Sequence, residues 1–230
     1  ATDDVVVADE LYGLIVWYKG IAAPGGGWEP PRVATSAAPN VYFFTLADVD
    51  GDADTDIVAG LIDGPDPLHG PNSVVWYRNV DPRGLFDPPI VVSQIGRSPE
   101  AVAIADVDAD GDSDIIVATW SMPAMLFWVA NVDGEGSFFS RVHYIAIRPN
   151  GGFSDIVVAD VAGKGLVVVA ANGRENTVEL FYKAGEPAFF EQFASFSAQL
   201  DVKAVALGDI DGDAALDAVM TNDDGGSVTW

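Results

Sequence analysis

The stretch Ala105–Thr119, ADVDADGDSDIIVAT, decides the fold of this chain. It holds a nine-residue loop rich in aspartate, and the loop leads without a break into the apolar run Asp114–Thr119. The β-branched residues of that run favour a strand, and nothing in the stretch has the 3.6-residue period of a helix. The pattern therefore predicts a strand, an acidic loop and a second strand.

The same unit recurs along the chain. Two more copies carry aspartates at the same places, ADVDGDADTDIVAG at 47–60 and GDIDGDAALDAVMT at 208–221. A fourth copy at 159–171 keeps the frame but loses most of the acids, and residues 4–8 match the end of the unit. An aromatic marker follows each copy, at spacings of 59, 52, 53 and 49 residues. A fixed period of this length indicates a repeat architecture.

Each repeat is expected to contain four antiparallel strands. In the best copy these are residues 101–107, 114–119, 126–132 and 137–146, with an Asp-Gly turn before the last. Several strands are apolar on both faces, which suits sheets that are covered on both sides by neighbouring sheets. Four-stranded sheets stacked in this way are the blades of a β-propeller, so we predict an all-β propeller. A plain sandwich of short strands is the alternative.

The repeat also predicts the domain organisation. Residues 1–230 are expected to form one propeller domain, made of partial blade 1–36, full blades 41–94, 100–147 and 153–197, and partial blade 203–230. The first unit carries strands two to four, and the last carries strands one to three. Because both contain strands two and three, they cannot combine into one ordinary blade. The chain is thus expected to be a fragment of a longer propeller.

The composition is acidic in a particular way. The net charge is −24, with 27 Asp against 8 Glu, while 49% of the residues are hydrophobic. Turns and oxygen-rich metal loops favour Asp, and a solvated acidic surface would not cluster it. A chain without a basic stripe is a poor partner for nucleic acid. It has no cysteine, and its longest apolar runs are too short to span a membrane.

The spacing of the aspartates predicts three metal sites. Side chains at loop positions 1, 3, 5 and 9, with the carbonyl of position 7, can converge on one hard cation, and calcium takes six to eight oxygens. We therefore predict about three structural calcium ions. The predicted ligands are Asp48, Asp50, Asp52, Asp54 and Asp56 in the first loop, Asp106, Asp108, Asp110, Asp112 and Asp114 in the second, and Asp209, Asp211, Asp213, Ala215 and Asp217 in the third.

These loops differ from other calcium loops. An EF-hand needs a glutamate at position 12, where this chain has Ala59, Val117 and Met220. Each loop also runs into an apolar strand instead of a helix. A catalytic metal would need an open coordination position and a nearby base, whereas one short loop here supplies nearly the whole shell. The sites are therefore expected to be structural.

The pattern D-x-D-x-D-G-x-x-D, or its D-x-D-G-D variant, followed by an apolar strand and a "WY.N.G.G.F" strand, resembles the FG-GAP/VCBS repeats. The resemblance covers essentially the whole chain and is best at 105–138. It implies an integrin-α-like propeller, commonly seven-bladed, with calcium between strands one and two. The fourth copy departs from the pattern: Asp160 remains, but Ala162 and Lys164 stand at ligand positions. There we expect the lysine ammonium to replace the cation.

The function is expected to reside on the face opposite the calcium loops. Connections that vary on a rigid scaffold usually carry specificity. The favoured interpretation is an extracellular or cell-surface adhesion or interaction module that binds a protein or glycan. Candidate contact residues are His69, Trp120, Trp28 and Tyr12, which alternatively cover loop bases.

No catalytic residue is predicted, because the sequence contains two histidines, no cysteine and no nucleophile elbow. Two alternatives stay open. One is a propeller-fold enzyme or enzyme-associated domain of the polysaccharide-lyase or phospholipase kind. The other is a structural repeat unit of an extracellular filament.

Overall fold

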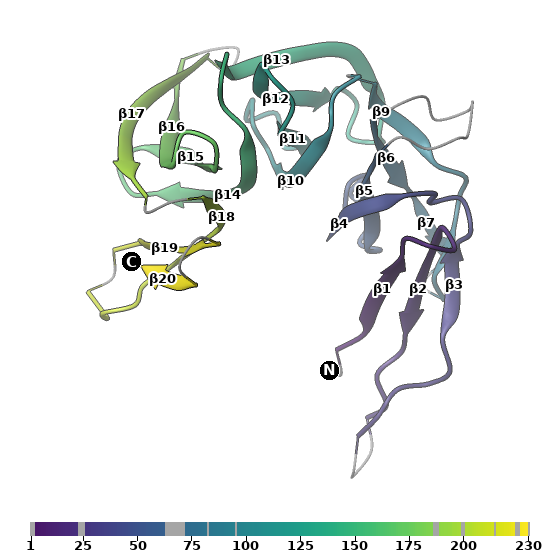
Figure 1. Ribbon diagram of the computed structural model, residues 1–230. Helices are drawn as coiled ribbons and strands as arrows, with labels where there is room; N and C mark the ends of the chain where they lie inside the picture. The colour runs from purple at the N-terminus through teal and green to yellow at the C-terminus, as the bar shows by residue number, and fades with distance from the viewer. Residues whose placement is uncertain are drawn as a thin grey trace. The chain divides into compact units, whose positions relative to one another are not determined.

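The computed structural model describes residues 3–22, 26–62, 72–81, 83–94, 96–185, 189–198, 201–213, 215–223 and 226–229, without the side chains of 139–141. These residues form antiparallel strands, turns and bends, and the described part of the chain contains no helix. Accordingly, none of it forms a helix long and apolar enough to cross a membrane. The all-β prediction is confirmed (Figure 1).

The chain divides into two compact units, Ala1–Gly96 and Arg97–Trp230. The first unit contains a three-stranded sheet, a four-stranded sheet and a small hairpin. The three-stranded sheet consists of β1 (Val5–Asp9), β2 (Leu14–Tyr18) and β3 (Arg32–Thr35). The four-stranded sheet has the order β4 (Val41–Ala47), β5 (Asp56–Leu61), β6 (Ser73–Tyr77) and β9 (Ile90–Gln94), and the hairpin pairs β7 (Asn79–Asp81) with β8 (Leu85–Phe86).

The two larger sheets of the first unit share one apolar core. Ile15 of β2 packs with Ile57 of β5 and with Val75 and Tyr77 of β6, all of them almost completely buried. All six residues of β5 and all five of β6 are buried. These strands are therefore covered on both faces, as their unbroken apolar sequences predict.

The second unit contains three sheets in chain order. The first consists of β10 (Pro99–Ala105), β11 (Asp114–Thr119), β12 (Ala124–Asn131) and β13 (Phe138–Arg148). The second consists of β14 (Phe153–Val161), β15 (Gly165–Asn172), β16 (Thr177–Gly185) and β17 (Phe189–Ser197). The third consists of β18 (Val202–Gly208), β19 (Asp217–Asn222) and β20 (Ser227–Thr229).

The sheets of the second unit pack through their first strands. β10 lies against β14, and β14 lies against β18, whereas the fourth strands β13 and β17 barely touch. The core between the first two of these sheets includes Trp128, Phe153 and Phe181. Sheets that meet at their first strands and diverge at their fourth are arranged like neighbouring propeller blades, so the fold of this unit is propeller-like.

Most strand predictions are confirmed, and one element was missed. The four strands expected within 101–146 lie at 99–105, 114–119, 124–131 and 138–148. The β7–β8 hairpin was not predicted. It forms because the chain turns at Gly84, which has φ of 78° and donates from its N–H to the Asp81 carbonyl at 2.7 Å.

Asp155 fastens the first strands of two sheets in the second unit together. Its Oδ2 accepts a hydrogen bond from the Val205 N–H, and its Oδ1 accepts one from the Ile156 N–H, both at 2.9 Å. Burial raises the pKa of Asp155 above its usual 3.8, although these two hydrogen bonds lower it. The folded state therefore holds this proton more tightly than the unfolded state does.

This shift predicts the sign of a pH effect. The contribution of Asp155 to stability should fall as pH rises from 3.8 to its raised folded pKa, because ionisation is harder in the folded state. The side chain of Asp155→Asn cannot ionise. As pH rises over this range, the free energy of unfolding of the variant should therefore increase relative to that of the parent. Urea unfolding of both proteins in excess calcium, at several pH values from about 4 upward, measures this difference. A constant difference across the window would contradict the prediction.

Candidate metal centre

Each Asp-rich loop connects the first and second strands of its sheet. The first loop (48–56) joins β4 to β5, the second (106–114) joins β10 to β11, and the third (209–217) joins β18 to β19. In each loop, one carboxylate oxygen from positions 1, 3 and 9 lies within 4.8 Å of the other two. Two oxygens bound to one calcium at about 2.4 Å can be at most about 4.8 Å apart. The clusters therefore fit one cation each.

Position 9 fixes the base of the loop by hydrogen bonds. Asp114 is fully buried, and its Oδ2 and Oδ1 accept hydrogen bonds from the N–H groups of Val107 (2.8 Å) and Asn131 (2.9 Å). Asp56 accepts equivalent bonds in the first loop, from Val49 and Asn79. These carboxylates thus tie the loop to the residues at the end of the third strand. In this position each of them also has an oxygen close to the carboxylate oxygens of positions 1 and 3.

Position 3 supplies buried carboxylate oxygens that lack hydrogen bonds within the described part of the protein. Both carboxylate oxygens of Asp50 and Oδ1 of Asp108 are buried without a hydrogen-bond partner of good geometry. A buried, unsatisfied anionic oxygen is strongly unfavourable, and a bound cation would satisfy it. This observation is independent of the spacing of the aspartates, and it supports a metal at these loops.

Position 5 makes a contact within the loop that was not predicted. Its carboxylate is not among the three clustered oxygens of any loop. Instead it accepts a hydrogen bond from the N–H of position 7, in the pairs Asp52–Asp54 (2.9 Å), Asp110–Asp112 (3.0 Å) and Asp213–Ala215 (2.7 Å). The side chain of position 5 thus shapes the turn, and its role as a ligand, like that of the carbonyl of position 7, stays a prediction.

The first and second loops turn through two left-handed residues, at positions 4 and 6. In the first loop these are Gly51 (φ 73°) and Ala53 (φ 71°), and in the second they are Ala109 (φ 67°) and Gly111 (φ 99°). Glycine occupies only one of the two positions in each of these loops. The structure shows that both positions are left-handed, and that each of these loops forces one alanine into a conformation that glycine adopts freely.

Three buried or half-buried carboxylates of the first and second loops are harder to ionise than a free aspartate. Burial raises the pKa of Asp114 to about 6, although the hydrogen bonds from Asn131 and Val107 lower it. Burial also raises the pKa of Asp56 and Asp108, and the neighbouring acids contribute in the same direction. A divalent cation would remove this penalty, since it stabilises the charged form.

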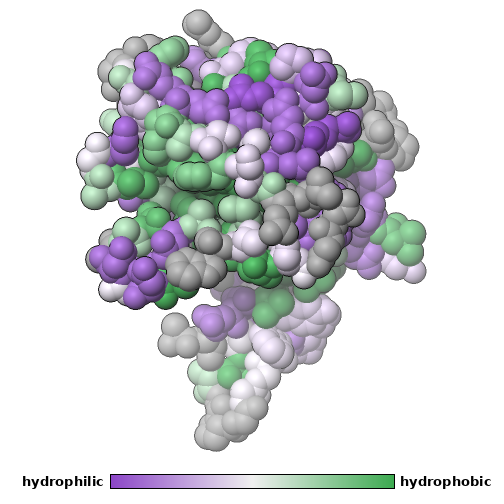
Figure 2. Space-filling view, turned by 60° about the vertical axis from the view of Figure 1, so that its left-hand side comes forward, coloured by the Kyte–Doolittle hydropathy of each residue, from purple (hydrophilic) through white to green (hydrophobic). Residues whose placement is uncertain are grey.

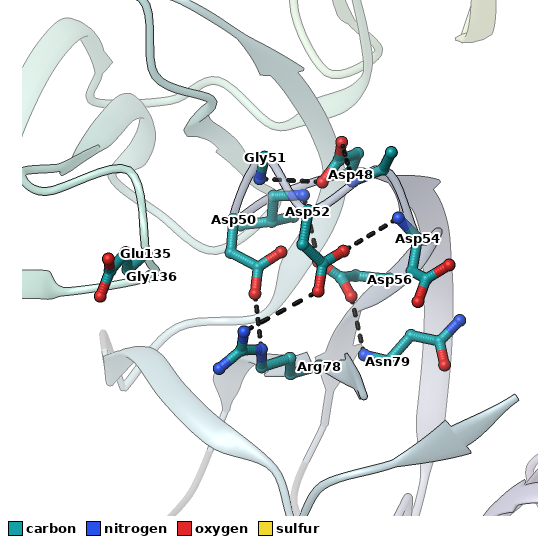
Figure 3. A network of polar contacts seen from close by, with 12 residues as sticks. Asp48, Asp50, Gly51, Asp52, Asp54, Asp56, Arg78, Asn79, Glu135 and Gly136 are labelled. Carbon is teal, nitrogen blue, oxygen red and sulfur yellow. Dashed lines mark hydrogen bonds and ion pairs between the residues drawn. The ribbon is translucent and has the colours of Figure 1, made fainter. Parts of the chain in front are cut away.

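One basic residue at the first loop escaped the sequence reasoning. The Nε of Arg78, which follows β6, lies 2.5 Å from Oδ2 of Asp50, and its NH2 lies 3.8 Å from Oδ2 of Asp52 (Figure 3). The signal in the sequence was only a basic residue two positions after the marker Trp76. The first loop is thus the one where the described residues bring a guanidinium to the position-3 carboxylate.

The fourth copy does not use its lysine as expected. Lys164 lies in the turn between β14 and β15, and its Nζ sits 4.4 Å from the ring centroid of Tyr182 and 4.9 Å from that of Phe193. Among the described residues it forms no ion pair. The ammonium therefore makes cation–π contacts with the sheet instead of replacing a cation among acids, and this sheet holds its turn by packing.

The predicted contact residues lie at different places. Tyr12 is in the β1–β2 turn and is 71% exposed. Trp120 follows β11, with the Arg174 guanidinium 4.8 Å and the Lys203 ammonium 5.4 Å from its ring centroid. Trp28 pairs with Gly20, whose N–H donates to Asp4, so it lies at the same end of its sheet as the Asp4 carboxylate. His69 lies outside the described residues.

Asp4 matches position 9 of an acidic loop, so Trp28 is at the loop end of its sheet and not at the opposite end as expected. The reason is the turn it occupies. Residues 19–31 connect the third and fourth strands of the repeat, and in an antiparallel sheet that connection shares an end with the connection between strands one and two.

The first unit also contains a cavity of about 390 Å³ at this loop end. Its walls combine apolar side chains with polar groups from the first acidic loop, and they include Asp4, Trp17, Asp54, Thr55, Asn79 and Phe86. No sequence signal pointed to it, because its walls come from both sheets of the unit.

Comparisons with known proteins inform the fold only. No protein-family model matches the sequence, and no curated protein does. Among solved structures, an endo-arabinase from Bacteroides thetaiotaomicron is similar with a TM-score of 0.60 and 7% identity, over 99% of this chain and 91% of that one. A functionally unknown protein from Desulfotomaculum acetoxidans has a TM-score of 0.47 and 11% identity, over 100% of this chain and 78% of that one. The first likeness supports a propeller-like all-β fold.

Proposed function

We propose that this chain is a calcium-stabilised propeller domain of the FG-GAP/VCBS kind, which acts as an extracellular interaction module. The single observation that carries the proposal is the repeated cluster of three carboxylates between the first and second strands of three sheets. Calcium suits these sites better than magnesium, because it accepts many oxygen ligands in a flexible geometry. Magnesium demands a strict octahedron and keeps its water molecules.

The extracellular location follows from the expected affinity. Calcium modules outside the cell typically bind with Kd of about 10⁻⁴–10⁻³ M. At millimolar calcium, each such site contributes on the order of 1 kcal/mol to folding stability. In calcium-poor cytosol the same sites would remain largely empty. The acidic loops are therefore useful to a protein that works where calcium is abundant.

The partner is proposed to be a protein or a glycan that binds the loops at the opposite end of the sheets. In the second unit, aromatic and basic side chains meet there around Trp120, which contacts Arg174 and Lys203. The neighbouring Met122 is 56% exposed, and its carbonyl accepts a hydrogen bond from Arg97. On the face that Figure 2 shows, hydrophilic residues gather in some areas and hydrophobic residues in others.

The enzyme alternative stays open. The likeness to an endo-arabinase concerns the fold, and one fold hosts many activities. The filament alternative rests only on the repeated sequence. We therefore keep the calcium-dependent module as the proposal. Activity assays on the same purified protein would test the catalytic alternative.

Calcium titration of the chelator-treated protein tests the proposal. We expect the melting temperature to rise by roughly 2–4 °C for each site that fills at about millimolar calcium, since about 1 kcal/mol shifts the melting temperature of a chain of this size by that amount. Magnesium at the same concentration should give a smaller rise. An unchanged melting temperature in calcium would refute the proposal.

The variant Asp108→Asn isolates the role of the ion. Asp108 Oδ1 has no hydrogen-bond partner of good geometry, so the change should cost little in chelator and should remove one site's share of the calcium effect. Asp160→Asn is the matched control, because Asp160 stands at position 1 of the fourth copy, which lacks the other acids. Equal calcium responses of the two variants would speak against a metal at the second loop.

A further inference from the structure

The first and second acidic loops are alike except for one residue. The third strand pairs with the second in the same register in both sheets, Trp76 opposite Val58 and Trp128 opposite Ile116. Two residues after each tryptophan, the chain has Arg78 in one sheet and Ala130 in the other. The asparagines that follow donate equivalent backbone hydrogen bonds to position 9 of their loops. The two sheets therefore differ at one structurally equivalent position, which is Arg78 in the first unit and Ala130 in the second.

The guanidinium of Arg78 is aimed at the carboxylate that a cation would need. The side chain of Asp50 is only 1% exposed, and Arg78 Nε is 2.5 Å from its Oδ2. Neither Asp50 oxygen has a hydrogen-bond partner of good geometry, so the ion pair is the main compensation for its charge. Asp108, the equivalent residue of the second loop, has no basic side chain near it among the residues that the structure describes.

We infer that Arg78 is an internal counter-cation of the first loop, and that calcium has to displace it to bind there. An arginine guanidinium stays protonated at all accessible pH values, so it cannot yield by losing its charge. Its side chain therefore has to move away from Asp50 into solvent. The side chain is already 40% exposed, so it has room for this movement. The inference rests on the proposed calcium function, and it makes the first loop the weaker site and the second loop the stronger one.

The same arrangement predicts that Arg78 has opposite effects on stability without calcium and with calcium. Without calcium, Arg78 compensates the buried Asp50 carboxylate and stabilises the fold. With calcium bound, Arg78 places a second positive charge beside the ion and opposes binding. Arg78→Ala should therefore lower the melting temperature in chelator and raise the gain in melting temperature on adding calcium. Replacing a residue that merely packed against the loop would change the melting temperature in the same direction in chelator and in calcium.

The test removes the arginine from the first loop and introduces one at the equivalent place of the second loop. The first loop is isolated by Asp108→Asn with Asp211→Asn, and the second by Asp50→Asn with Asp211→Asn, and calcium binding is measured by isothermal titration calorimetry. We expect the second loop to bind about tenfold more tightly, because in the first loop the ion pair between Arg78 and the buried Asp50 carboxylate must be broken before the cation binds. Arg78→Ala should tighten the first loop about tenfold, and Ala130→Arg should weaken the second by a similar factor.

Arg83→Ala controls for net charge, since Arg83 belongs to the same unit and its side chain is 87% exposed. Equal changes in Arg78→Ala and Arg83→Ala, or equal affinities of the two isolated loops, would overturn the inference and leave the calcium proposal intact. Failure of both isolated loops to bind calcium would instead overturn the calcium proposal. Arg78→Gln, which retains the side-chain stem, serves as the second variant if Arg78→Ala does not fold.

Discussion

Asp114→Ala is expected to lower the free energy of unfolding by about 3–5 kcal/mol in the presence of calcium. The alanine leaves the buried N–H groups of Val107 and Asn131 without acceptors, and each such loss costs about 1–3 kcal/mol. The change also removes one ligand of the second loop. Relief of the penalty that raises the Asp114 pKa offsets part of this loss, which is why the range stops below the sum.

Asp217→Ala is the matched comparison for this prediction. Asp217 holds the same position in the third loop, but it is more exposed, and its one described hydrogen bond comes from Ile210 at 2.9 Å. Its replacement should cost clearly less. Urea unfolding of both variants, in excess calcium and in chelator, separates the loss of hydrogen bonds from the loss of the ion. If both variants lose the same stability, position 9 does not act as the described anchor.

Arg148→Ala is expected to cost about 3–5 kcal/mol, the usual effect of leaving one member of a buried ion pair alone. Arg148, at the end of β13, donates from Nε and NH2 to the Glu179 carboxylate of β16 at 3.0 and 2.5 Å. The Glu179 side chain is 3% exposed, so its charge has little access to water once the arginine is gone. Only Asn172 and Thr177 would then remain as described donors.

Two further variants give this prediction its control. The double variant Arg148→Met with Glu179→Leu removes both charges and should recover much of the loss, because it leaves no unpaired buried charge. Arg174→Ala removes an arginine of the same unit that has no carboxylate partner among the described residues, and it should cost less. A thermal or urea unfolding series compares all of them. A double variant as unstable as Arg148→Ala would contradict the account.

The sequence predicted the parts of this fold that depend on neighbours in the chain. The acidic loops and the flanking strands follow from patterns within each repeat unit, and the four-strand repeat follows from the recurrence of that unit along the chain. The structure places Asp106, Asp108 and Asp114 together as the loop spacing requires. The strands β5 and β11, which are apolar except for their first aspartates and the last threonine of β11, are buried throughout, as their apolar runs indicated. Local patterns of this kind are readable because alternation and turn chemistry act over a few residues.

The features that were missed depend on contacts between distant segments. Arg78 reaches Asp50 across 28 residues, and Arg148 reaches Glu179 across 31. Asp155 accepts a hydrogen bond from the chain 50 residues later. No spacing rule links such pairs in a single sequence, since the pairing of strands within a sheet and the packing of one sheet on the next decide them. The same limit explains why Lys164 turned out to lie on aromatic rings.

The left-handed alanines of the acidic loops have one more consequence. Ala53 and Ala109 hold a conformation that costs a residue with a side chain of the order of 1–3 kcal/mol, and a glycine at either place would avoid that strain. This strain favours opening of the loop when no cation is present. A cation held between the carboxylates would oppose that opening, so it would set the rigidity of these sheet ends as well as their charge.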